Sequence, residues 1–134
     1  RNLNNTLIIT GEYAIGDYAF QYWTAIREVI ISGEITSIAE RAFEGSSIVS
    51  ITLPTSVKSI GYDAFYRCSS LTSITIPSSV TEIGSEAFRY CSSLTSITFK
   101  GTIANWTAIR KGNFWGMNVP ATEVVCSDGV VEIW

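Results

Sequence analysis

Residues 71–94 read LTSITIPSSVTEIGSEAFRYCSSL and residues 48–71 read IVSITLPTSVKSIGYDAFYRCSSL, so nearly the same segment occurs twice at a spacing of 23 residues. A unit of this length is too small to bury its own apolar side chains, and each copy must therefore cover its neighbour. The repetition predicts a repeat solenoid, in which the chain winds through similar coils that share one continuous core.

Apolar residues recur at equivalent positions along the chain once one deletion is allowed for, because the loop after Phe43 is one residue shorter than the loop after Phe65. We expect the side chains in these columns to point into the shared interior, because each column repeats once per coil. The columns are Ile26, Ile48, Leu71, Leu94; Val29, Ile51, Ile74, Ile97; Ile31, Leu53, Ile76, Phe99; Ile35, Val57, Val80, Ile103; Ile15, Ile38, Ile60, Ile83, Trp106; and the Ala-Phe pairs 19–20, 42–43, 64–65 and 87–88.

The pattern within one repeat places the local elements. Residues 73–76 alternate polar and β-branched apolar side chains, which predicts a short half-buried strand that ends at Pro77. Residues 80–83 predict a second short extended segment, and Gly84 a turn. Residues 85–90 predict one turn of α-helix or 3₁₀-helix with Ser85 as its cap.

Both ends of the chain depart from the repeat, as capping segments do. We expect one domain over residues 1–134. Its N-terminal cap and first partial repeat cover 1–25, its core repeats cover 26–99, and its C-terminal cap covers 100–134.

The capping segments carry their own signals. Leu7 and Ile9 can supply a first strand, although the distance from Ile9 to Ile15 is one residue shorter than in later repeats. Residues 105–112 predict a helix with Asn105 as N-cap, Gly112 as its end and Trp106 over the core. Residues 122–134 predict a hairpin, because Asp128-Gly129 suits a two-residue primed turn.

Composition limits the function classes. The 134 residues are 46% hydrophobic and 16% charged with a net charge of −3, which suits an ordered core and disfavours nucleic acid as a partner. No apolar run approaches the roughly 20 residues of a membrane span. No signal-peptide pattern opens the chain, and because residue 1 is Arg we expect a trimmed fragment.

The repeat resembles that of the BspA-like leucine-rich repeat family, which consists mainly of bacterial surface and secreted proteins. The similarity covers residues 26–99, extends to Gly16-Asp-Tyr-Ala-Phe20, and includes the closing motif Val125-Cys-Ser-Asp-Gly129. It implies a right-handed superhelix of short parallel strands and short helical turns, which is an α/β, strand-rich solenoid. It also implies an extracellular or cell-surface location and adhesion to a host or extracellular-matrix protein, or alternatively to a glycan. It implies no catalytic residue and no cofactor.

Catalytic chemistry has little support in the residues themselves. The chain has no histidine, which removes Ser-His-Asp and Cys-His catalysis and imidazole metal ligands. Asp63 and Glu86 occupy one column and could in principle hold a cation or cut a glycoside, but we favour a solvated surface, because these positions vary between the repeats. The glycines recur for turn geometry and do not form a phosphate-binding loop.

Cys68 and Cys91 occupy equivalent positions in adjacent repeats, at a rung spacing of about 4.8 Å that a disulfide tolerates. Parallel stacking leaves their Cβ atoms farther apart than a disulfide prefers, so we favour two reduced, buried thiols. In the same column we expect Trp23 to pack next to Gly45. The three cysteines have no zinc-ligand spacing.

The positions that the repeat leaves free give the best functional candidates. Tyrosine and arginine are enriched at the energetic centres of protein interfaces, and here they gather just after each Phe. The opposing interpretation is that tyrosine covers the apolar face of the predicted helical turns and arginine keeps this face soluble. We therefore predict a non-enzymatic binding module, with a structural spacer and a carbohydrate-active enzyme as alternatives. The candidate partner-binding residues are Tyr22, Tyr62, Tyr66, Arg67, Arg89 and Tyr90.

Overall fold

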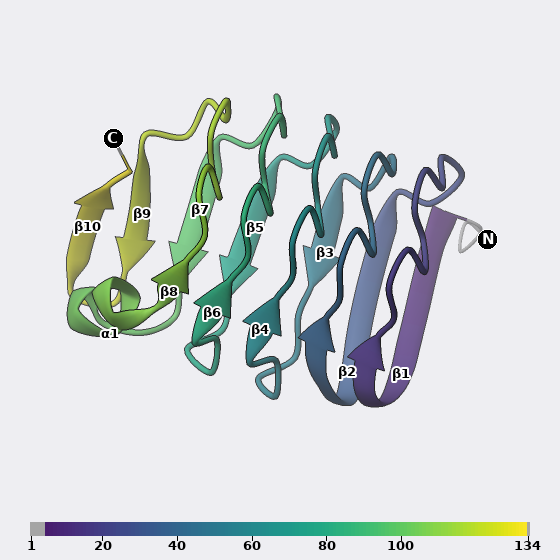
Figure 1. Ribbon diagram of the computed structural model, residues 1–134, viewed down its shortest axis with the longest axis horizontal. Helices are drawn as coiled ribbons and strands as arrows, with labels where there is room; N and C mark the ends of the chain where they lie inside the picture. The colour runs from purple at the N-terminus through teal and green to yellow at the C-terminus, as the bar shows by residue number, and fades with distance from the viewer. Residues whose placement is uncertain (1–4, 134) are drawn as a thin grey trace.

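The computed structural model describes residues 5–133 and shows a solenoid whose coils stack side by side along one axis (Figure 1). The coils of β3 and β4, β5 and β6, and β7 and β8 each have one strand in each of two layers, whereas β1 and β2 each run as one long strand through both layers. A tight turn follows one edge of the solenoid and a longer loop follows the other. One sheet holds β1 (Thr6–Ile15), β2 (Glu28–Ile38), β4 (Ser59–Ile60), β6 (Glu82–Ile83) and β8 (Arg110–Lys111), with β3 (Ser50–Thr52) paired to β2. The other holds β5 (Ser73–Ile76), β7 (Ser96–Phe99), β9 (Glu123–Cys126) and β10 (Gly129–Glu132).

The strand register confirms the predicted strand columns. Parallel pairing places Ile74 opposite Ile97 and Ile76 opposite Phe99, all four of them buried. Because side chains on a strand alternate between faces, the intervening serines and threonines point outward and the core stays apolar.

The first strand accommodates the segment from Ile9 to Ile15, which is one residue shorter than its counterparts in later repeats. β1 pairs with β2 in parallel over its whole length, and Leu7 and Ile9 take the predicted positions opposite Val29 and Ile31. The register shifts between Tyr13 and Ala14, so the missing residue is absorbed as a β-bulge.

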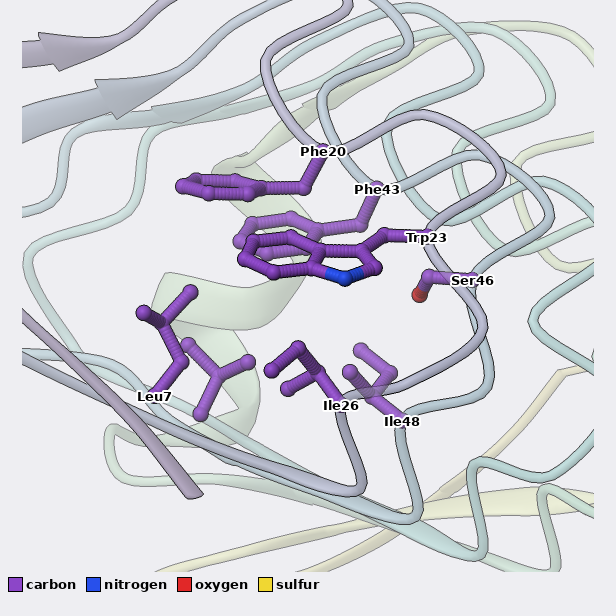
Figure 2. A pocket seen from close by; sticks show the side chains of 8 residues that line it. Leu7, Phe20, Trp23, Ile26, Phe43, Ser46 and Ile48 are labelled. Carbon is purple, nitrogen blue, oxygen red and sulfur yellow. The ribbon is translucent and has the colours of Figure 1, made fainter. Parts of the chain in front are cut away.

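Four phenylalanines, one from each of four successive coils, form a single file through the core. The ring centroids of Phe20, Phe43, Phe65 and Phe88 follow one another at 5.3, 5.5 and 5.2 Å, with interplanar angles of 17°, 2° and 3°. Figure 2 shows the N-terminal end of this file, where Trp23 and Phe20 stack near Phe43 and face Leu7, Ile26 and Ile48 across a small apolar cavity.

The C-terminal helix differs from the prediction for residues 105–112. Helix α1 spans Ile103–Ala108, and its N-cap is Thr102, whose hydroxyl accepts a hydrogen bond from the Asn105 N–H at 3.1 Å. A threonine hydroxyl in extended backbone satisfies one of the free N–H groups of the first turn, which is why the helix begins earlier.

Trp106 is buried against Phe99 as expected, but it does not continue the column that ends at Ile83. Lys111 occupies that position, because β6 pairs with β8 with Ile83 opposite Lys111. Helix α1 therefore inserts five residues relative to the repeat. The Phe file ends against Trp115, whose ring meets Phe88 edge-on at 6.5 Å.

The chain closes with the predicted hairpin, although its turn lies one residue earlier than expected. β9 runs parallel to β7, and β10 runs antiparallel to β9 with Gly129 opposite Cys126. The two loop residues are therefore Ser127 and Asp128, and neither has the positive φ of a primed turn.

The cysteine column corrects another prediction. Ser46, not Gly45, stands in line with Trp23, Cys68 and Cys91, because the deleted residue falls after Ser46 and not before it. Cys68 and Cys91 are free and fully buried, and their thiols donate to the carbonyl oxygens of Phe43 and Phe65 at 3.0 Å. Burial raises the pKa of the Cys91 thiol.

Candidate functional site

The candidate residues lie on the loop edge of the solenoid. The prediction of a helical turn at residues 85–90 is wrong, because Glu86 and Tyr90 have φ of 58° and 63°. Each loop carries two such left-handed residues, and they form two columns. The first column is Tyr18, Arg41, Asp63, Glu86 and Phe114, and the second is Tyr22, Gly45, Arg67, Tyr90 and Asn118.

These left-handed residues connect the coils. The first four members of each column donate their backbone N–H to a carbonyl oxygen in the following coil, at 2.7–3.2 Å. A left-handed non-glycine residue costs roughly 1–2 kcal/mol, and the hydrogen bonds between coils offset this cost. The same conformation leaves the Tyr22 and Arg67 side chains exposed on the loop edge.

Four of the six predicted residues come together in what we call the ridge: Tyr66, Arg67, Arg89 and Tyr90. The guanidinium carbon of Arg67 lies 5.4 Å from the Tyr66 ring centroid and 4.9 Å from that of Tyr90. The Tyr90 ring also contacts Arg89, whose guanidinium carbon lies 5.0 Å from the Tyr90 ring centroid. Cation–π contacts of this kind contribute about 0.5–1 kcal/mol each at exposed sites, so they hold the ridge in a defined shape.

The other two predicted residues lie outside the ridge. Tyr62 is 40% exposed and its ring centroid is 5.3 Å from the Arg41 guanidinium. Tyr22 is 62% exposed, and its hydroxyl donates a hydrogen bond to Glu44 Oε2 at 3.5 Å. In the second column of left-handed residues, Gly45 is the member that separates Tyr22 from Arg67.

Sequence reasoning missed Phe114, which extends the ridge by one coil. Its ring centroid lies 5.1 Å from the Arg89 guanidinium, and the side chain is 48% exposed. Residues 113–118, Asn-Phe-Trp-Gly-Met-Asn, are a further copy of the loop at residues 85–90 and could have indicated Phe114. This copy lies five residues later than the repeat spacing predicts, because α1 is inserted before it.

The carboxylates of the loop edge neutralise two of its arginines. Arg41 pairs with Asp63 at 3.5 Å and with Glu44 at 3.7 Å, while Arg89 pairs with Glu86 at 2.9 Å.

Asp63 is 3% exposed, and its Oδ1 atom has no hydrogen-bond partner. Its burial raises its pKa to about 6, an effect that the Arg41 charge opposes and the Glu86 and Glu44 charges reinforce. A carboxyl group held in this way serves the packing of the loops, and it does not line the groove described next.

A shallow groove runs beside the ridge. It is lined by Tyr22, Gly45, Arg67, Ser69, Tyr90 and Ser92. Gly45 is the member of its column without a side chain, and the Tyr22 ring packs against its backbone.

Neither a metal site nor a membrane-spanning helix is found among the described residues. Across residues 5–133, no three histidine, cysteine or acidic side chains gather closely enough to hold a metal ion. In the same part of the chain, α1 does not have the length or apolar character to span a membrane.

The stacked coils and parallel strands, with little helix, define a β-solenoid of the leucine-rich repeat class. Residues 4–133 match the family model described as "BspA type Leucine rich repeat region (6 copies)", and the chain belongs to this family. This confirms the resemblance seen in the repeat.

A solved structure supports the fold. The chain is similar to the crystal structure of the T. pallidum leucine-rich repeat protein TpLRR, with a TM-score of 0.51 and 20% sequence identity. The match covers 92% of this chain and 73% of the T. pallidum chain. No curated protein matches the chain by sequence.

Proposed function

We propose that this chain is a non-enzymatic protein-binding module of a bacterial surface or secreted protein, and that the ridge is its contact surface. The family match supports a binding role on a repeat scaffold. The observation that carries the proposal is the packing of Arg67 on the loop edge against both Tyr66 and Tyr90, whose rings meet edge-on at 5.7 Å.

The ridge has the physical properties of an interface centre. Tyrosine and arginine give large contact area and several hydrogen-bond donors, and they dominate binding energy where they are found. Here their mutual stacking fixes the side chains before a partner arrives, so less conformational entropy is lost on binding. The partner class we favour is a host or extracellular-matrix protein, with a glycan as the alternative.

The Asp63 and Glu86 pair gives less support to a carbohydrate-active enzyme. Both groups form ion pairs with arginines, and Asp63 is buried beneath the loop edge. A glycosidase needs both carboxyl groups to reach the substrate from either side of the scissile bond.

The test is a binding screen of the chain against immobilised matrix proteins and glycans by biolayer interferometry. Alanine replacement of all four ridge residues should abolish the strongest interaction, while Arg110→Ala on β8, where the side chain is 80% exposed, should not change it. Circular dichroism would check that both variants are folded. An interaction that survives the fourfold replacement would refute the ridge as the contact surface, and an absence of any partner would favour a structural spacer.

A further inference from the structure

Arg67 is the arginine of the ridge whose charge no carboxylate of residues 5–133 neutralises. Arg41 and Arg89 each pair with carboxylates, but within residues 5–133 Arg67 makes no ion pair. Its neighbours are the rings of Tyr66 and Tyr90, and its side chain is exposed. Aromatic stacking orients a guanidinium group through its faces and leaves the N–H groups at its rim free to bind an anion.

The groove gives that guanidinium group a receiving space. A Cβ atom at Gly45 would lie 2.5 Å from Cδ1 of Tyr22, so the Tyr22 ring rests directly on the glycine backbone. The Tyr22 ring therefore fills the space beside Gly45 and forms one side of the groove, while Arg67 forms the other side and the hydroxyls of Ser69 and Ser92 line the same groove.

The carboxylates near the groove do not compete for Arg67. Glu44 is 4% exposed, and it accepts a hydrogen bond from Gln21 at 2.6 Å besides its contacts with Arg41 and Tyr22. Glu86 is held by Arg89. The one positive charge left over at this groove is therefore available to a ligand.

We propose that the groove beside Gly45 binds an aspartate or glutamate side chain of an exposed peptide segment in the partner protein, with Arg67 as the group that receives the carboxylate. This inference rests on the proposed function, because it names the chemistry by which the ridge recognises its protein partner. A guanidinium group and a carboxylate form two parallel charge-assisted hydrogen bonds, and the serine hydroxyls can bind the flanking peptide groups.

The same groove is less suited to an acidic sugar. Sugars are held largely by stacking on open aromatic faces, whereas Tyr90 already has Arg67 and Arg89 at 4.9 and 5.0 Å and the Tyr22 ring lies on Gly45. Of the aromatic groups that line the groove, Tyr90 orients cations, and only Tyr22, which is 62% exposed, keeps a free face.

The experiment begins with selection of a phage-displayed random dodecapeptide library on the immobilised chain. Fluorescence polarisation then measures the Kd of the most enriched peptide and of its matched copy with Gln and Asn in place of Glu and Asp. The variants are Arg67→Gln, which removes the charge, and Gly45→Asn, which tolerates positive φ but displaces the Tyr22 ring that forms one side of the groove. Arg110→Gln is the control, and 3′-sialyllactose is the acidic-sugar probe.

We expect the enriched peptides to contain Asp or Glu, and we expect affinity to fall by about tenfold or more in Arg67→Gln, because a hydrogen bond to a charged group is lost. The Gln and Asn copy should be weakened to the same degree, Gly45→Asn should also weaken binding, and Arg110→Gln should not. Binding should decrease as the salt concentration rises.

Several results would overturn the inference: enrichment of peptides without an acidic residue, unchanged affinity in Arg67→Gln, no enrichment at all, or binding of sialyllactose through Arg67 in place of the peptide. The ridge variants separate this failure from that of the proposed function. If a non-acidic peptide loses affinity when Tyr66 or Tyr90 becomes Ala, the ridge remains a protein-binding surface and only the carboxylate assignment is wrong. If no bound peptide depends on any ridge residue, both are wrong.

Discussion

Replacement of Phe65 by alanine should remove a large share of the stability of the solenoid. The side chain is fully buried, and parallel rings flank it at 5.5 Å and 5.2 Å on its two sides. A buried Phe→Ala change costs about 3–5 kcal/mol, and each lost ring pair adds about 0.5–1.5 kcal/mol beyond the area term, so we expect the upper half of that range. Total stabilities of single domains are about 5–15 kcal/mol, which makes this a severe loss.

The matched comparison is Phe20→Ala at the N-terminal end of the same file. Phe20 is only half-buried, and we expect its loss to cost about 2 kcal/mol because water already reaches part of the ring. Equilibrium urea unfolding, followed by circular dichroism at 25 °C, would give both free energies of unfolding. A cost below about 1 kcal/mol for Phe65→Ala, or a larger cost at Phe20 than at Phe65, would refute a core shared between neighbouring coils.

Three other changes test separate features. Because burial raises the pKa of Asp63 to about 6, above its ordinary 3.8, the native state binds this proton more tightly than the unfolded chain does. The contribution of Asp63 to stability should therefore rise as the pH falls from about 6 to about 4, and urea midpoints at pH 7 and pH 5 should differ less in Asp63→Asn than in the parent. Ser46→Cys should raise the urea midpoint by extending the column of buried thiols that donate to phenylalanine carbonyl groups, and a lower midpoint would contradict that assignment. Gly84→Ala should destabilise by about 1–3 kcal/mol, because its Cβ would lie 2.6 Å from the Tyr62 backbone nitrogen, whereas Gly16→Ala, with nothing within 4 Å, should be near neutral by the same measurement.

The sequence was most informative where the chain repeats without interruption. The columns through Ile74 and Phe65 followed from spacing alone, because a parallel coil places the same position of each repeat in one line. The loop after Phe43 is one residue shorter than its counterparts, but its length does not show whether the deletion lies before or after Ser46. Only the hydrogen bonds between coils place the deletion after Ser46.

The loops were harder to predict than the strands. The segment around Glu86 and Tyr90 has the composition of a helical turn, yet both residues adopt positive φ because hydrogen bonds to the next coil outweigh local preference. The ridge was predicted in part, since four of its members belong to adjacent repeats. Phe114 was not predicted, because the residues of α1 shift it out of the repeat spacing. The groove was not predicted either, because it lies at Gly45, which has no side chain to mark a candidate site.

The closing hairpin limits how such a chain can grow during evolution. Among the described strands, β10 is the one that pairs antiparallel with its neighbour. A new coil added beyond β10 would therefore find no parallel strand with which to continue the solenoid. A duplicated segment placed between two interior coils meets matching side chains above and below and leaves both ends of the solenoid as they are. Relatives with different numbers of coils should therefore differ by whole multiples of 22 or 23 residues among the interior coils, while the hairpin that closes the solenoid stays alike.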